Sequence, residues 1–295
     1  MTTAQSLIIY DGPSLHDGIT PIVVIAVRSS RNTKTGDMVQ TYIMLRDVDP
    51  REANKFGLDE AICGFCPHKG KAFDRDDPAG VLRKLAEGRT CYVNIAQGVL
   101  IVWRHFQKGG YSYAKDNAEI TALAAGAMVR KGTYGDPAMV PSSVWEALLG
   151  EAKGHTGYSH QADNPNADFR PDLTMVSVET EMQAWQHWAK GHRTFRMLAE
   201  HEQPVAGQEI LCPSPKVKCT DCGCVPACDP APSPSPSLPT ARAKATSIGV
   251  RLRPDTLVSH FLLTWIIQAT RVIHVNSNRH RESLHHGQAH YTSDS

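Results

Sequence analysis

The chain of 295 residues is long enough for one α/β domain of barrel size or for two smaller domains. Its hydrophobic content of 41% and charged content of 21% are typical of a globular protein with a buried core. The formal net charge of +1 excludes a whole-molecule attraction to nucleic acid or anionic membranes, although a local basic patch would not show in this total.

The two ends of the chain give no sign of a membrane association. The first residues, 1–6, lack the basic and then apolar pattern of a secretory signal. The longest apolar run, 257–275, is interrupted by polar and charged side chains that are costly in a bilayer. We therefore expect a cytoplasmic protein, and in a reducing compartment C-x-x-C pairs favour metal binding or redox chemistry over structural disulfides.

Three strands are predicted near the N-terminus, at 7–10, 21–27 and 40–46. The second is a continuous apolar run, which indicates a strand buried on both faces, as in a parallel or barrel sheet. A polar loop before the third strand contains Asn32 and Lys34. These two residues are either part of an ordinary hairpin connection or contacts to a bound cofactor.

A short helix is predicted to start at Asp49, because Asp49 can cap the free amides and Pro50 suits the first helical position. This helix would deliver the chain to the first cysteine group. Further on, the apolar run 98–103 is a candidate strand that could instead open a helix.

The first cysteine group consists of Cys63 and Cys66, at C-x-x-C spacing, and Cys91. Thiolates are soft ligands that select zinc, Cu(I) or iron–sulfur clusters. Three cysteines on a [4Fe–4S] cluster leave one iron open for a small molecule. Alternatively, the same three cysteines and His68 close a tetrahedral structural zinc site.

The second cysteine group contains every other cysteine of the chain. Cys212, Cys219 and Cys222 with either Cys224 or Cys228 supply four thiolates. Four thiolates suit a structural zinc or a fully ligated auxiliary cluster.

From residue 127 onward, apolar β-prone segments alternate with helical ones. Helical spacing of apolar residues predicts helices within 141–152 and 181–190. The predicted strand segments are 127–130, 155–160, 173–179 and 193–198. This alternation is typical of βα units and a parallel sheet, so the expected fold is α/β with a partial or complete parallel βα barrel.

In such folds chemistry gathers at the carboxyl ends of the strands, where this chain carries polar residues. For any single residue the alternative is an ordinary surface or ion-paired role. The catalytic candidates are Tyr134, Asp136, His160 and Glu179. The cofactor-binding candidates are Asn32, Lys34, Arg130, Tyr158, Ser177, Arg193 and Arg196.

The composition changes after residue 224. The expected organisation is a metal-binding domain over 1–224, an extended Pro/Ala/Ser-rich linker over 225–250 and a poorly ordered tail over 251–295. The tail is rich in histidine, which could also bind metal.

Several short motifs occur in a fixed order along the chain: Gly12-Pro13-Ser14, Asn32-Thr33-Lys34-Thr35-Gly36, Cys63-Gly64-Phe65-Cys66-Pro67-His68, Cys91-Tyr92-Val93-Asn94, Tyr134-Gly135-Asp136-Pro137, Thr156-Gly157-Tyr158-Ser159-His160, Arg193-Thr194-Phe195-Arg196, Cys212-Pro213 and Cys219-Thr220-Asp221-Cys222. This set resembles an uncharacterised phage and plasmid protein family, distantly similar to the phage gene-product-88-like proteins.

The resemblance implies a relative of the radical S-adenosylmethionine barrel, in which Cys63, Cys66 and Cys91 take the cluster positions. It also implies that the strand-end residues face S-adenosylmethionine and substrate. Two departures are visible: the usual C-x-x-x-C-x-x-C spacing is absent, and the family's C-x-x-C-x-x-C-x-Gly pattern is broken after Gly223. A shift of reading frame near Gly223 is our hypothesis for the second departure.

Two functions are consistent with these observations. The first is an iron–sulfur, radical-type metalloenzyme of a phage or plasmid, acting in the host cytoplasm on an unknown small molecule or macromolecule. The second is a zinc-stabilised binding protein of a mobile element that contacts nucleic acid or a host factor. For nucleic acid, the phosphate contacts would be Arg31, Lys34, Arg130, Arg193 and Arg196.

Overall fold

Most of the N-terminal two thirds of the chain is described by a computed structural model. The described residues are 5–28, 37–77, 80, 82–199, 201–213, 216, 218 and 220, together with the backbone of 247–251. The chain divides into two units, one of residues 1–197 with 204–250 and one of residues 198–203 with 251–295. Everything described below as the candidate site belongs to the first unit.

The first sheet has six strands in the order β4-β1-β2-β3-β5-β6. Strand β2 runs antiparallel to both β1 and β3, whereas the pairs β3·β5, β5·β6 and β1·β4 are parallel. The strands are β1 (Ser6–Pro13), β2 (Pro21–Val27), β3 (Val39–Leu45), β4 (Ser112–Tyr113), β5 (Met128–Tyr134) and β6 (Gly154–Thr156). The strands predicted at 7–10, 21–27 and 40–46 are thus confirmed.

The expected parallel setting of the strand at 21–27 is wrong, because both of its neighbours are antiparallel. The predicted burial of this strand is confirmed, since residues Ile22–Ala26 are all buried. A continuous apolar run reports only that both faces of a strand are covered, and helices can cover both faces whatever the strand direction.

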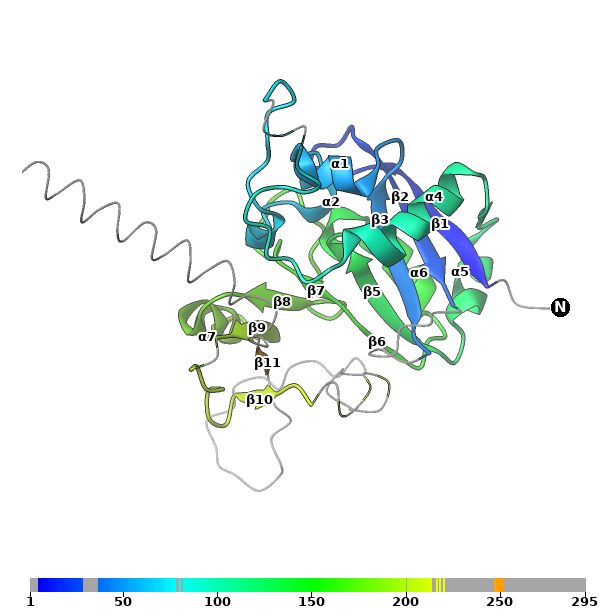
Figure 1. The fold of residues 1–295 in the computed structure, drawn as a ribbon. Helices are drawn as coiled ribbons and strands as arrows, with labels where there is room; N and C mark the ends of the chain where they lie inside the picture. Colours follow the sequence, from blue (N-terminus) through cyan, green and yellow to red (C-terminus); the bar gives the residue numbers. More distant parts are fainter. Residues whose placement is uncertain are drawn as a thin grey trace, which may run out of the picture. The chain divides into compact units, whose positions relative to one another are not determined.

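Helices flank this sheet on either side (Figure 1). The predicted cap is confirmed, because the Asp49 side chain accepts from the backbone N–H of Arg51. The run 98–103 is helical rather than extended, since Val99, Val102 and Trp103 recur at helical spacing toward the core. The elements are α1 (Pro50–Lys55), α2 (Glu60–Cys63), the 3₁₀ turns η1 (Pro67–Lys69) and η3 (Pro137–Met139), the π turn η2 (Ile95–Val99), α4 (Leu100–Gln107), α5 (Asn117–Ala124) and α6 (Ser142–Leu149).

The second sheet has five strands in the order β10-β11-β9-β8-β7. Its elements are β7 (Tyr158–Ser159), β8 (Met175–Val178), α7 (Glu181–Ala189), β9 (Thr194–Leu198), β10 (Glu209–Leu211) and β11 (Ser247–Arg251). The strands β7, β8 and β9 are parallel. Only Gly157 separates β6 from β7, so the parallel order β3, β5, β6 continues into β7, β8, β9.

The protein is therefore mixed α/β with a mostly parallel central sheet, and the βα alternation predicted after residue 127 is present. In the part of the chain that the structure describes, the strands form two open sheets and not a closed barrel. Most of the proposed linker and nearly all of the proposed tail lie outside the described residues; the exceptions, 247–250 of the linker and 251 of the tail, form β11. Within the described residues, no helix combines the length and the apolar character that crossing a bilayer requires.

Candidate metal centre

A cavity of about 120 Å³ lies where β5, β7, β8 and β9 reach their carboxyl ends. The segments that carry the first cysteine group form its other wall. Its lining includes Cys63, Cys66, His68, Cys91, Tyr134, Asp136, Tyr158, His160, Ser177 and Glu179. Residues that the sequence separates by more than 100 positions therefore share one concave surface.

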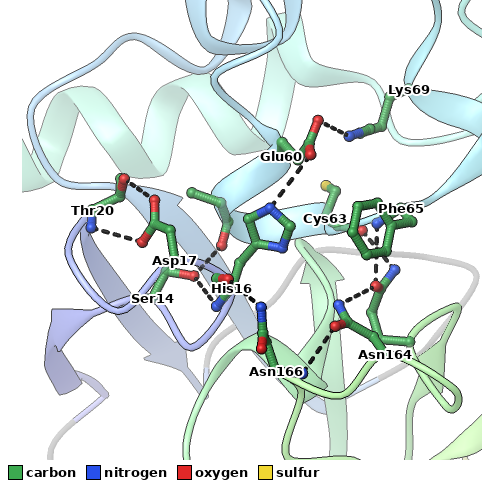
Figure 2. Close-up of polar contacts among 12 residues, drawn as sticks. Ser14, His16, Asp17, Thr20, Glu60, Cys63, Phe65, Lys69, Asn164 and Asn166 are labelled. Atoms are coloured by element: carbon green, nitrogen blue, oxygen red, sulfur yellow. Dashed lines mark hydrogen bonds and ion pairs between the residues drawn. The ribbon is translucent and has the colours of Figure 1, made fainter.

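The C-x-x-C turn starts where α2 ends. Gly64 has a φ of +53°, which side-chain-bearing residues rarely adopt, and this conformation reverses the chain between the two thiols. The buried Gln161 fastens the turn, because its Oε1 accepts from the Phe65 N–H at 3.1 Å and its Nε2 donates to the Cys63 carbonyl at 2.9 Å. Figure 2 shows Cys63 and Phe65 at this turn, with Asn164 approaching from the opposite segment.

The other side of α2 is fastened by the polar contacts drawn in Figure 2. The Ser14 hydroxyl donates to the carbonyl of Ala61 at 2.5 Å. Glu60 lies 3.4 Å from His16 Nε2 and 3.2 Å from Lys69 Nζ, measured to its carboxylate oxygens. These contacts link the loop after β1, helix α2 and turn η1. The segment that carries Cys63 and Cys66 is therefore held by polar contacts on both sides.

Cys91 reaches the cavity because the long spacer before it is closed at its base. Lys71 and Glu87 exchange two backbone hydrogen bonds, of 2.8 and 2.9 Å. The Cys91 N–H then donates to the His68 carbonyl at 3.1 Å. The Arg89 guanidinium donates to the carbonyls of Cys91 and Val93 at 2.8 and 2.9 Å, which holds this irregular segment in place.

The thiols Cys63, Cys66 and Cys91 are free, and each is partly buried. Burial, followed by the negative charges of Asp59 and of the other two thiols, raises the pKa of Cys63 well above its ordinary value. Burial also raises the pKa of Cys91, although the charge of Arg89 opposes this. Thiols with raised pKa values become ligands when a cation compensates their charge, since the thiolate is the ligand form.

His68, His160 and Glu179 meet on one side of the cavity. The Nε2 atoms of both histidines lie near the same carboxylate oxygen, Glu179 Oε1, at 3.1 and 3.0 Å. Hydrogen bonds from His160 and then His68 lower the pKa of Glu179 to about 2. Burial lowers the pKa of His160, but hydrogen bonds to Cys66 and Glu179 outweigh it and raise that pKa to about 10.

Two buried polar atoms of the lining have no hydrogen-bond partner in the structure. They are the hydroxyl oxygen of Tyr134 and Oδ1 of Asp59, on side chains that are 3% and 2% exposed. Burial is the largest cause that raises the pKa of each. An orphaned polar atom this deeply buried is costly, so both atoms point to a polar group that the cavity takes up.

Asp136 connects the two walls of the cavity. Its N–H donates to the Ile62 carbonyl at 2.7 Å, while its carboxylate accepts from the N–H groups of Ala138 and His160 at 3.0 and 2.9 Å. It thus joins the end of α2 to the residue that follows β7. These contacts give Asp136 a positioning role for His160.

The other cofactor-binding candidates are distributed unevenly. Tyr158 and Ser177 line the cavity. Arg130 donates to the Tyr92 hydroxyl at 2.6 Å and lies 5.5 Å from the centre of the Tyr158 ring. The described cavity lining includes neither Arg193 nor Arg196. Arg193 directly precedes β9 and therefore lies at the amino end of this strand, whereas the cavity lies at the carboxyl end. Arg196 is buried and pairs with Glu209.

Several predicted residues lie outside the described part of the chain. These are Arg31, Asn32 and Lys34 of the polar loop and the cysteines of the second group other than Cys212. Cys212 itself is a free, partly buried thiol.

Three lining or supporting residues are not among the candidates predicted from the sequence: Asp59, Arg89 and Gln161. Each of them either forms hydrogen bonds with backbone groups or lies beside residues that are distant in the sequence. Motif spacing in the sequence predicts neither kind of contact. Asp59 and Arg89 are charged residues close to Cys63 and Cys91, and this proximity was the one available clue.

No protein-family model, curated protein sequence or solved structure matches the chain.

Proposed function

We propose that the protein is an iron–sulfur metalloprotein in which Cys63, Cys66 and Cys91 hold a [4Fe–4S] cluster at one wall of the cavity. The observation that carries this proposal is that all three free thiols line one cavity although 24 residues separate Cys66 from Cys91. Three thiolates on a four-iron cluster leave one iron accessible to a small molecule in the cavity.

The three thiols are not grouped at the spacing of ligands to a single zinc ion. Around one zinc, sulfur ligands at about 2.3 Å from the metal lie about 3.8 Å from one another. Among the described residues, the group whose candidate ligand atoms all lie within 4.8 Å of one another is His68, His160 and Glu179, without any cysteine. A cluster separates its ligands more widely, because each thiolate binds a different iron.

The orphaned atoms of Tyr134 and Asp59 support a polar occupant beside Cys63. Hydrogen-bond donors near cluster sulfurs tune the potential of iron–sulfur centres. The Tyr134 hydroxyl has a proton to donate, and burial raises the pKa of Asp59, whose carboxyl donates when it is protonated.

The proposed ligand of the open position is S-adenosylmethionine, within a partial βα barrel related to the radical enzymes and to the phage and plasmid family that the motifs resemble. The parallel order that continues from β3 to β9 supports the partial barrel. The rings of Tyr158 and Phe195, with centroids 4.2 Å apart and planes tilted by 37°, offer an aromatic surface for the adenine.

The test is metal analysis of the full-length protein purified without oxygen. We expect iron and acid-labile sulfide in equal amounts and an absorbance near 400 nm. A Cys63→Ser/Cys66→Ser/Cys91→Ser variant loses both iron and sulfide. Equilibrium dialysis with S-adenosylmethionine before and after removal of the iron then tests the ligand.

A Cys212→Ser variant is the matched control, because Cys212 is a free thiol that is absent from the cavity lining. It should retain the iron and sulfide that the first cysteine group binds. Zinc at one or two ions per chain with neither iron nor sulfide contradicts the cluster and favours the zinc-stabilised binding protein instead.

A further inference from the structure

We propose a second metal position in the same cavity, in which His68, His160 and Glu179 bind one divalent first-row transition metal ion. Two histidines and one carboxylate are the ligand set of mononuclear iron(II) sites and of catalytic zinc sites. The inference rests on the cavity described for the proposed function, but it uses none of the three cysteines as ligands.

Two of the three distances between the candidate ligand atoms fit one metal ion. Two ligands about 2.1 Å from a metal lie about 3.0 Å apart at a right angle and about 3.4 Å apart at the tetrahedral angle. Glu179 Oε1 lies 3.1 Å from His68 Nε2 and 3.0 Å from His160 Nε2, within this interval. All three ligand atoms lie within 4.8 Å of one another.

The ring of His68 is oriented by a hydrogen bond on its far side. Its Nδ1 lies 2.8 Å from the Thr90 hydroxyl, which turns Nε2 toward the cavity and Glu179. A polar partner on the second ring nitrogen is the usual feature that fixes a metal-binding histidine. The imidazole planes of His68 and His160 meet at 67°, so the two nitrogens approach the carboxylate from different directions.

The other two ligands are fixed through the backbone. The N–H of His160 donates to the buried carboxylate of Asp136 at 2.9 Å. The N–H of Glu179 donates to Gln183 Oε1 at 2.8 Å, at the capping box that begins α7. Each ligand therefore comes from a different element and is held before any metal binds, which lowers the cost of ordering the site.

The remaining coordination positions would face the cavity. The three side chains are 24%, 21% and 32% exposed, so a solvated ion can reach them. With three protein ligands, the ion keeps positions for water or for a small molecule, as open catalytic sites do. His160 also hydrogen-bonds Cys66, which places this metal position next to the proposed cluster.

Cobalt(II) is the probe that separates the two positions, because thiolate ligands give cobalt an intense near-ultraviolet charge-transfer band and histidine or carboxylate ligands do not. The full-length protein is purified without oxygen, reconstituted with its cluster, loaded with cobalt(II) and desalted. We expect Glu179→Gln and His160→Ala to lower bound cobalt by one ion per chain and to leave iron, sulfide and any thiolate band unchanged.

His105→Ala is the matched control, since His105 is an exposed histidine outside the cavity lining and should leave bound cobalt unchanged. Far-ultraviolet circular dichroism identifies variants that fail to fold, and Glu179→Gln, which keeps the size of the side chain, is the more conservative of the two changes. Unchanged cobalt in folded Glu179→Gln overturns the proposal, as does loss of the thiolate band together with the cobalt. Absence of iron and sulfide with cobalt still bound through Glu179 contradicts only the cluster.

Discussion

At the scale of single residues, the C-x-x-C turn depends on a glycine. Gly64 has a positive φ, and a Cβ atom added there would lie 2.2 Å from Gln161 Oε1, the group that accepts from Phe65. A side chain at this position therefore strains the backbone and displaces the residue that holds the turn.

We predict that Gly64→Ala lowers the free energy of unfolding by about 3 kcal/mol, because strain of about 1–2 kcal/mol adds to the loss of buried hydrogen bonds. Gly109 also has a positive φ, but an added Cβ there meets nothing within 4 Å. Gly109→Ala should thus cost only the backbone strain. Urea denaturation of both variants measures the difference, and equal losses would show that the contact with Gln161 is unimportant.

At the scale of the elements, the start of α7 positions Glu179. The Thr180 side chain accepts from the Gln183 N–H, and Gln183 Oε1 in return accepts from the N–H groups of Thr180 and Glu179. The capping residue, Thr180, thus directly follows Glu179, the proposed metal ligand.

We predict that Thr180→Ala lowers the free energy of unfolding by about 1 kcal/mol, the usual contribution of a helix cap. Thr180→Ser keeps the hydroxyl and should be close to wild type. Chemical denaturation followed by circular dichroism measures both. A loss in Thr180→Ser as large as that in Thr180→Ala would assign the effect to the methyl group and not to the cap.

Local chemistry allowed most elements to be predicted. Apolar runs predicted β1 and β2, and Asp49 with Pro50 predicted the start of α1. The partners of each strand could not be predicted in the same way, because burial on two faces does not reveal the direction of the neighbours. The antiparallel setting of β2 is the example.

For the candidate site as well, the general location could be predicted from the sequence, but the partners of individual side chains could not. The carboxyl ends of parallel strands are a general location for polar chemistry, and Tyr134, His160 and Glu179 do line the cavity. The rule ranks no strand-end residue above another, so it also selected Arg196. Only the structure reveals that Glu209, 13 residues later, lies beside Arg196 and forms an ion pair with it.

At the scale of the whole first unit, this ion pair fastens the segment after residue 204 to β9. Arg196 is 1% exposed and Glu209 is 7% exposed, and two hydrogen bonds of 2.8 and 2.6 Å join them. Removing one partner takes an opposite charge away from a buried charged group, which costs far more than the pair itself contributes.

We predict that Arg196→Met and Glu209→Gln each lower the free energy of unfolding by about 3–5 kcal/mol. The double variant Arg196→Met/Glu209→Gln should lose less than the sum of the two single losses, because either single variant already removes the direct interaction. A double-mutant cycle by urea denaturation measures this coupling. Additive losses would contradict a direct interaction between the two side chains.

The closed base of the spacer between the cysteines has a consequence for engineering. Because Lys71 and Glu87 pair through their backbones, Cys91 is placed by that pairing and by His68, and not by the length of chain in between. Lys84 is exposed within the spacer, so a short peptide tag inserted after Lys84 should leave metal content unchanged. The same tag inserted after Gly88, between the Lys71–Glu87 pairing and Cys91, should lower the metal content. Elemental analysis of the two tagged proteins compares their metal contents. We therefore expect that the spacer can carry a label or an affinity tag without a change in the cavity.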